Sequence, residues 1–195
     1  CLYRVWKDSL LQTRLRGLIN IFDKYILAED GHLKLFFDND WNCSYDIFSY
    51  GHDIEASWLL HESALVLGEE ESLAKVEARV PSVVAAATEG FTPEGGMIYE
   101  KLGDHIDGDR HWWVQAEAAV GYFNLWEHFG TQEGIENAIH CWEYIKKEIV
   151  DQENGEWYWS VRGDGTINRV EDKAGFWKCP YHNGRMCLEI IERVK

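Results

Sequence analysis

Positive charge is scarce in this sequence, which has 19 lysines and arginines against 34 aspartates and glutamates and a formal net charge of −15. Nucleic acids and anionic membrane surfaces are bound mainly through clusters of basic side chains. The sequence contains no such cluster. We therefore expect neither nucleic acid nor a membrane among the partners of this protein.

Membrane spans and export signals are also lacking. No apolar run approaches the roughly 20 residues that a helix needs to cross a bilayer. The chain opens with Cys1-Leu2-Tyr3-Arg4, which has neither a methionine nor the basic-then-apolar pattern of a signal peptide. Its five cysteines are an odd number, scattered, and never spaced as the close pairs of a zinc knuckle. We expect a cytoplasmic protein with reduced thiols, whose natural N-terminus lies upstream of Cys1.

The sequence has no complete motif for binding calcium or a nucleotide. Asp38-Asn39-Asp40 begins like a calcium loop, but Cys43 replaces the turn glycine and Ser49 stands where the bidentate acid belongs. There is no glycine-rich loop that would cradle a phosphate. The sequence therefore predicts no metal and no cofactor.

Helical periodicity dominates the chain, and no linker or low-complexity tract divides its 195 residues, so we expect one domain over residues 1–195. Apolar spacing predicts helices over Leu10 to Ile26, His52 to Leu67, Glu70 to Thr88 with a kink at Pro81, His111 to Phe129, Gln132 to Val150, and from near Tyr181 onward. The intervening segments change period. They predict a β-hairpin over Leu33 to Tyr50, an irregular or extended stretch over Gly95 to Arg110, and a hairpin-like stretch over Glu156 to Gly175.

The predicted helices alternate in character along the chain. Those beginning near His52 and His111 are apolar nearly all round, whereas their neighbours are amphipathic. A ring of helical hairpins in two layers produces this alternation, because inner helices are covered on every side and outer helices face water. The fold class we expect is an all-α (α/α)6 toroid with short β-hairpins in its loops. Only about three of the six hairpins are present.

Polar and aromatic clusters stand at the start of each buried helix. They are Tyr50-Gly51-His52-Asp53-Ile54-Glu55, Arg110-His111-Trp112-Trp113-Val114-Gln115-Ala116-Glu117 and Pro180-Tyr181-His182-Asn183-Gly184-Arg185. Any one of them could be a helix start capped by Asp53 or Asn183. Three at the same structural phase indicate a shared funnel for a polar ligand. His52 and Glu55 are three residues apart, so we expect the carboxylate to fix the tautomer of the imidazole.

Motifs that overlap these clusters resemble, in order and spacing, the active-site motifs of the cellobiose 2-epimerase family, within the N-acylglucosamine 2-epimerase superfamily. They are Tyr50-Gly51-His52-Asp53-Ile54-Glu55-Ala56-Ser57-Trp58, Trp112-Trp113-Val114-Gln115-Ala116-Glu117 and Trp177-Lys178-Cys179-Pro180-Tyr181-His182-Asn183. The resemblance runs through nearly the whole chain and implies the C-terminal half of the family's single barrel domain. It implies that His52 and His182 are the general acid/base pair and that Glu55 supports His52. It also implies that Trp112, Trp113, Glu117 and Trp177 form the sugar site. An arginine and a third histidine that the family uses have no counterpart in this chain.

The reaction implied by this resemblance is epimerisation at C2 of the reducing-end sugar of cellobiose-type disaccharides, through an enediolate. Three alternatives stay open at the level of sequence. The first is another reaction of the same superfamily, N-acylglucosamine 2-epimerisation or aldose–ketose isomerisation. The second is a toroidal glycoside hydrolase using Glu55 and Glu117 as its carboxylates. The third is a carbohydrate-binding fragment without chemistry, since aromatic faces alone bind sugars.

Overall fold

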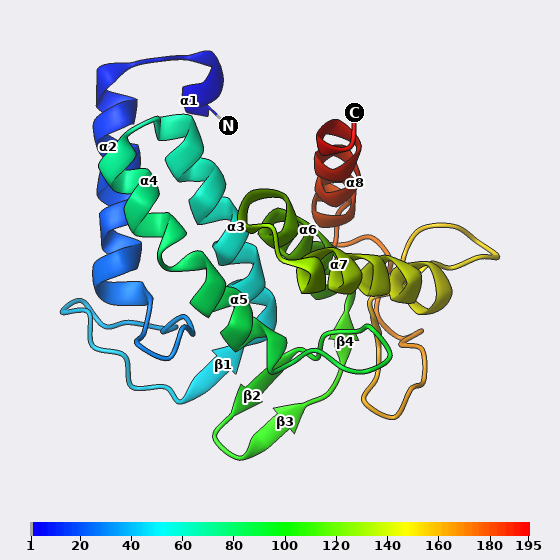
Figure 1. Ribbon diagram of the computed structural model, residues 1–195. Coiled ribbons are helices and arrows are strands. Elements are labelled where there is room, and N and C mark those ends of the chain that lie inside the picture. Colours follow the sequence, from blue (N-terminus) through cyan, green and yellow to red (C-terminus); the bar gives the residue numbers. More distant parts are fainter. Residues whose placement is uncertain (1) are drawn as a thin grey trace.

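The structure, a computed structural model, describes residues 2–195 and is mostly helical (Figure 1). Its helical elements are α1 (Leu2–Val5), α2 (Ser9–Ile21), the π-helix η1 (Phe22–Ile26), α3 (Tyr50–Leu67), α4 (Glu70–Glu77), α5 (Val80–Thr88), α6 (Trp112–Phe129), α7 (Gln132–Tyr144), the π-helix η2 (Ile145–Ile149) and α8 (Tyr181–Arg193). The predicted helices are confirmed, and Pro81 in the first turn of α5 marks the break from α4. Within the described residues no helix combines the length and apolarity that a bilayer crossing requires.

The helices form two layers. The inner layer consists of α3, α6 and α8, and α6 packs against both of the others; α5 packs on the outside of α3, and α7 on the outside of α6. Every residue from Trp112 to Asn124 of α6 is buried, as expected for a helix covered all round. In α7 only four residues are buried, so its other faces meet water. The predicted alternation of inner and outer helices is therefore confirmed.

Two glycines let α3 and α6 cross closely. A Cβ atom on Gly51 would lie 2.5 Å from the Trp113 ring, and one on Gly121 would lie 2.6 Å from the Ile54 side chain. Such contacts are too short for any side chain, so the crossing requires glycine at both positions. As a result the first turns of α3 and α6 stand side by side.

The β-structure differs from the expected hairpins. Strands β1 (Ile47–Ser49), β2 (Glu100–Leu102) and β3 (His105–Asp107) form one antiparallel sheet, and β4 (Arg110–His111) pairs with β5 (Ser160–Val161).

The predicted hairpin over Leu33 to Tyr50 is wrong. Its second arm contains β1, which pairs with β2 of the next repeat, with Ile47 opposite Leu102. The first arm makes only isolated bridges. One of them joins Phe37 to Cys43 across a turn in which Asp38 accepts hydrogen bonds from the amides of Asp40 and Asn42.

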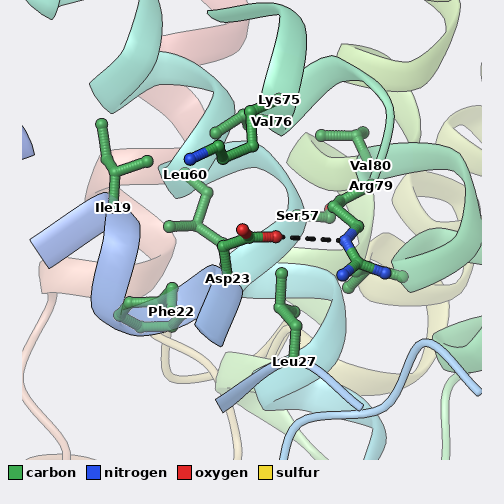
Figure 2. A pocket seen from close by; sticks show the side chains of 11 residues that line it. Ile19, Phe22, Asp23, Leu27, Ser57, Leu60, Lys75, Val76, Arg79 and Val80 are labelled. Carbon is green, nitrogen blue, oxygen red and sulfur yellow. Dashed lines mark hydrogen bonds and ion pairs between the residues drawn. The ribbon is translucent and has the colours of Figure 1, made fainter. Parts of the chain in front are cut away.

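The interface of α3 with η1 and the α4–α5 pair is tightly filled. Figure 2 shows the space between α2, η1, α3 and the α4–α5 pair, where Asp23 accepts a hydrogen bond from Nε of Arg79 at 3.2 Å amid apolar side chains. The cavity there is about 10 Å³, no larger than one water molecule needs. This interface is structural and is excluded as a sugar site.

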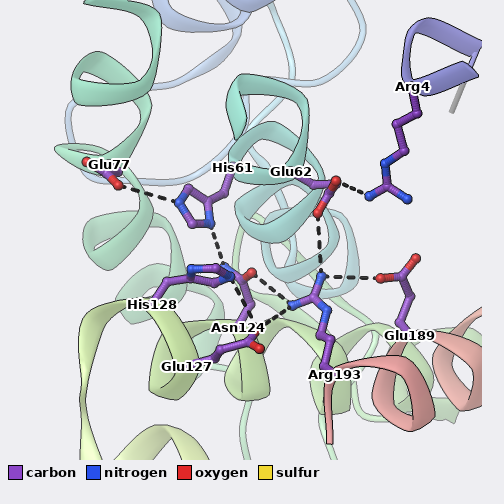
Figure 3. A network of polar contacts seen from close by, with 9 residues as sticks. All are labelled: Arg4, His61, Glu62, Glu77, Asn124, Glu127, His128, Glu189 and Arg193. Atoms are coloured by element: carbon purple, nitrogen blue, oxygen red, sulfur yellow. Dashed lines mark hydrogen bonds and ion pairs between the residues drawn. The ribbon is translucent and has the colours of Figure 1, made fainter. Parts of the chain in front are cut away.

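A polar network joins the other ends of the inner helices, far along them from their first turns (Figure 3). Arg193 of α8 donates hydrogen bonds to Asn124 Oδ1 at 3.1 Å and Glu127 Oε2 at 3.3 Å, both on α6. Asn124 in turn donates to Nδ1 of His61 on α3 at 3.3 Å. The three inner helices are therefore held together by hydrogen bonds at this end.

Candidate functional site

A cavity of about 590 Å³ opens where α3, α6 and α8 begin. Helices supply one part of its lining, and loops and short strands supply the rest. The residues that line it are Phe36, His52, Glu55, Tyr99, His111, Trp112, Trp113, Trp159, Trp177, Tyr181 and His182. The cavity is large enough for a sugar ring, and its aromatic walls suit one.

The indole of Trp113 stands between the two predicted acid/base residues. Its ring centre lies 4.8 Å from that of His52 and 5.6 Å from that of His182. Trp113 is 9% exposed and His182 is 6% exposed, so both belong to the floor of the cavity rather than its rim. The structure thus brings together residues 52, 113 and 182, which are far apart in the sequence, as the three clusters predicted.

His52 is held by the last residue of β1. Its Nδ1 lies 2.7 Å from Oγ of Ser49, the residue just before the helix. The next residue, Asp53, accepts hydrogen bonds from the Leu33 amide at 2.8 Å and pairs with Nδ1 of His32 at 2.7 Å. Burial lowers the pKa of His52, the nearby Asp53 charge partly restores it, and the proximity of His182 lowers it again. The net shift is downward, which leaves the ring neutral and basic at pH 7.

His182 is fixed by a carboxylate. Its Nδ1 lies 2.6 Å from Oε1 of Glu117, which is 1% exposed. A carboxylate only accepts hydrogen bonds, so Nδ1 carries the hydrogen and Nε2 is the nitrogen that can exchange a proton with a ligand. Glu117 also accepts from Nε1 of Trp58 at 2.9 Å and from Arg185 at 2.7 Å. One carboxylate on α6 therefore contacts side chains from both other inner helices.

Glu55 does not have the predicted role. We expected it to hold the His52 ring, but it accepts a hydrogen bond from Arg185 at 2.6 Å, while Ser49 occupies His52 Nδ1. The guanidinium on α8 lies opposite α3 and attracts the carboxylate away from its own helix. Burial and the neighbouring Glu117 raise the pKa of Glu55, and Arg185 opposes them.

Glu55, Glu117 and His182 are also the one group of acidic and histidine residues, in the part of the chain that the structure describes, with ligand atoms all within 4.8 Å of one another. Arg185 contacts both carboxylates, so a positive side chain already neutralises the position that a cation would take. The spacing of these residues along the chain did not reveal the group, because α8 completes it.

The predicted sugar-site residues occupy different depths. Trp112 is buried in the wall, where its ring lies 4.5 Å from that of Trp159. Glu117 is not among the lining residues and lies behind His182, which it contacts. Trp177 is 73% exposed and stands at the mouth. Asp53 and Asn183 do not cap their helices, because α3 already begins at Tyr50 and α8 at Tyr181. Asn183 donates a hydrogen bond to Glu156 at 3.0 Å.

Sequence reasoning missed several lining residues that come from loops and short strands. His111 ends β4 and stacks on Tyr99 with ring centres 4.1 Å apart, and burial lowers its pKa. Phe36 and Trp159 complete the lining. His111 belongs to the second polar cluster predicted from the sequence, although no separate role was assigned to it, whereas Tyr99 was not singled out. Phe36 carried no signal, because the predicted hairpin placed it in a strand.

The two layers of helices, with a cavity where the inner helices begin, have the arrangement of part of a helical toroid. The sequence profile of the N-acylglucosamine 2-epimerase (GlcNAc 2-epimerase) family matches residues 2–184, and the chain belongs to this family.

Its relatives agree in sequence and in structure. The cellobiose 2-epimerase of Bacteroides fragilis is 58% identical over 97% of this chain and 49% of its own length. That of Ruminococcus albus is 45% identical over 98% of this chain and 50% of its own length. The crystal structure of a sugar epimerase from a ruminal bacterium superimposes with a TM-score of 0.94 at 37% identity, over 98% of this chain and 50% of that one. The expected fold class is confirmed, and the chain spans about half the length of the relatives it matches.

Proposed function

We propose that this chain carries the acid/base half of a sugar 2-epimerase that interconverts the reducing-end glucose and mannose units of cellobiose-type β-1,4 disaccharides. One observation carries the proposal: His52 and His182 flank the Trp113 ring at the floor of one cavity. The 58% identity to a protein named cellobiose 2-epimerase supports it.

The reaction follows from the way the two rings are held. The sugar ring opens, and the neutral imidazole on one face removes the proton at C2, which leaves an enediolate. The protonated imidazole on the other face then delivers a proton to C2, and the configuration there is inverted. Positioned acid/base groups each contribute roughly 10²–10⁴-fold to such a step. This proton transfer needs neither a metal nor a nicotinamide.

The partner of this chain in the proposal is the rest of the toroid, because the relatives are about twice as long. By the resemblance of its motifs we assign this chain to the C-terminal half. A glycoside hydrolase is disfavoured, since it needs two carboxylates facing the cleft. Here Glu55 and Glu117 share one guanidinium, and Glu117 is covered by His182 and Arg185.

The test is solvent exchange at C2. The full-length protein containing this chain is incubated in D₂O with cellobiose, glucose or N-acetylglucosamine, and the products are followed by NMR. We expect deuterium at C2 and a mannose-type epimer from cellobiose. Accumulation of a ketose, or turnover only of N-acetylglucosamine, would instead assign one of the other reactions of the superfamily. Tight sugar binding with no exchange at C2 would refute catalysis altogether.

A further inference from the structure

A buried lysine lies directly beside the active-site loop. Between β5 and α8 the chain forms no regular element, and Val170, Phe176 and Trp177 there are exposed. Lys178, which follows Trp177, is only 1% exposed. Burying an ammonium group costs several kcal/mol unless it is fully paired, so its surroundings need an explanation.

The Lys178 ammonium has two hydrogen-bond acceptors and an aromatic ring around it. Its Nζ donates hydrogen bonds to Oε1 of Glu156 at 2.8 Å and to the carbonyl of Lys173 at 2.8 Å. It also lies 5.5 Å from the centre of the Trp112 ring, within range of a cation–π interaction. The loop is therefore anchored at this residue to the turn before β5 and to the wall of the cavity.

Glu156 connects the same anchor to α8. Its Oε1 accepts a second hydrogen bond, from Nδ2 of Asn183 at 3.0 Å. Burial acts to raise the pKa of Glu156, but the hydrogen bonds from Lys178, Trp157 and Asn183 outweigh it and the pKa is lowered. Its backbone has a φ of 60°, which is uncommon for a residue other than glycine. The carboxylate thus binds two groups that belong to the loop and to the helix.

Both groups are next to functional residues. Lys178 follows Trp177 at the mouth of the cavity, and Asn183 follows His182 at its floor. A shift of either anchor moves a neighbour that contacts the sugar. We propose that Lys178, Glu156 and Asn183, which we name the Lys178 clasp, are positioning residues that hold Trp177 and His182 in register for the reaction. The inference rests on the proposed function for its kinetic consequences.

The experiment compares Lys178→Met, Glu156→Gln and Lys173→Met in the full-length protein. Lys173 is the matched control, because its side chain contacts Asp151 and the Gly155 carbonyl rather than Glu156 or Asn183. Its replacement by methionine keeps the backbone carbonyl to which Lys178 donates. A displacement of about 1 Å costs on the order of 10²-fold in rate. We expect Lys178→Met to lower kcat by about that factor and to raise KM for cellobiose. Glu156→Gln should also lower kcat and raise KM, but by smaller factors than Lys178→Met. Lys173→Met should keep the wild-type kcat and KM.

A second readout does not depend on activity. Amide hydrogen exchange over residues 175–184 should become faster in Lys178→Met and Glu156→Gln and stay unchanged in Lys173→Met. If kcat, KM and this exchange are unaltered in both clasp variants, or if only Tm falls, the clasp has no positioning role. If Lys178→Met does not fold, Glu156→Gln decides by the same criteria. A wild-type protein that fails to exchange C2 refutes the proposed function, whereas the exchange data still judge the clasp.

Discussion

Each of the two cavity histidines has its Nδ1 within hydrogen-bond distance of a protein oxygen, Ser49 Oγ for His52 and Glu117 Oε1 for His182. For His182 the carboxylate fixes the tautomer. For His52 the hydroxyl can donate or accept, so Nε2 is a base when the Ser49 hydroxyl accepts from Nδ1–H. The two rings thus have different partners while serving one site.

Removal of either ring should abolish the reaction. We expect His52→Ala and His182→Ala, in the full-length protein, each to retain less than about a tenth of wild-type epimerisation, because a required proton-transfer group contributes roughly 10²–10⁴-fold. The fold should stay near wild type by circular dichroism. Turnover above that level in either variant would show that its ring is not required for proton transfer.

The pH dependence should follow His52. Its pKa lies below the ordinary value of 6.5, chiefly through burial. The ring therefore stays a free base down to pH 6.5, and kcat/KM should fall as pH drops below that value and the ring takes up a proton. The charge of Asp53 raises the pKa of His52, so Asp53→Asn should move the acid limb to lower pH. A limb that moves upward in this variant would contradict the assignment.

The site residues could be predicted in part. His52, Trp113 and His182 lie in the polar clusters at helix starts, which sequence periodicity locates well. The resemblance to the family implied the role of each. The contact of Glu55 with Arg185 was not predicted, because residue spacing along α3 gives no information about a side chain on α8. Ser49 carried no signal of its own, since a serine before a helix ordinarily indicates a cap.

At the scale of elements, the close crossing of α3 and α6 determines where Trp113 stands. Gly121→Ala would place a Cβ 2.6 Å from Ile54 Cγ1 and 3.0 Å from the Ile54 carbonyl oxygen. Overpacking of this kind costs about 1–3 kcal/mol, so we expect the free energy of unfolding in urea to fall by that amount. Gly17→Ala in α2 is the control, since nothing lies within 4 Å of its Cβ position. Alanine should stabilise the helix there by about 0.5–1 kcal/mol. Equal effects at both sites would show that the crossing tolerates a methyl group.

Helices were predictable and strand pairs were not, for a physical reason. A helix satisfies its hydrogen bonds within itself, so its apolar spacing is a local record of its environment. Strand β1 of the first repeat instead pairs with β2 of the second. In the same way, β4 of the second repeat pairs with β5 of the third. Alternation within Leu33 to Tyr50 could not show which distant segment would supply the partner.

At the scale of the whole molecule, two surfaces are apolar and uncovered. On α8, Leu188 is 65% exposed, Ile191 53% and, just after the helix, Val194 64%. Near the N-terminal end of the chain, Val5 is 85% exposed and Leu10 is 61% exposed. These two surfaces are where the next helices of a closed ring would pack.

We expect the 195-residue chain, expressed alone, to associate and to be inactive, because exposed contiguous apolar patches of more than a few hundred Å² drive association. Sedimentation at several concentrations measures this. Addition of the complementing segment of the toroid in trans should dissociate the assemblies and restore epimerisation. Charged residues at two of the α8 positions, as in Leu188→Glu/Ile191→Lys, should reduce self-association. A monodisperse and fully active monomer of the chain alone would contradict this prediction.

Glu117 accepts hydrogen bonds from Trp58, His182 and Arg185, and this has a consequence for directed evolution. In a library that varies Glu117, most variants would be lost through reduced stability before they could be selected for activity on a new sugar. Each substitution there removes hydrogen bonds that join α6 to α3 and α8. Phe36, Tyr99, Trp159 and Trp177 lie outside the helices and line the same cavity. Diversity placed at those four positions alters the shape presented to a substrate while the proton-transfer apparatus stays untouched. We therefore expect new substrate specificities to arise first from substitutions at these four positions.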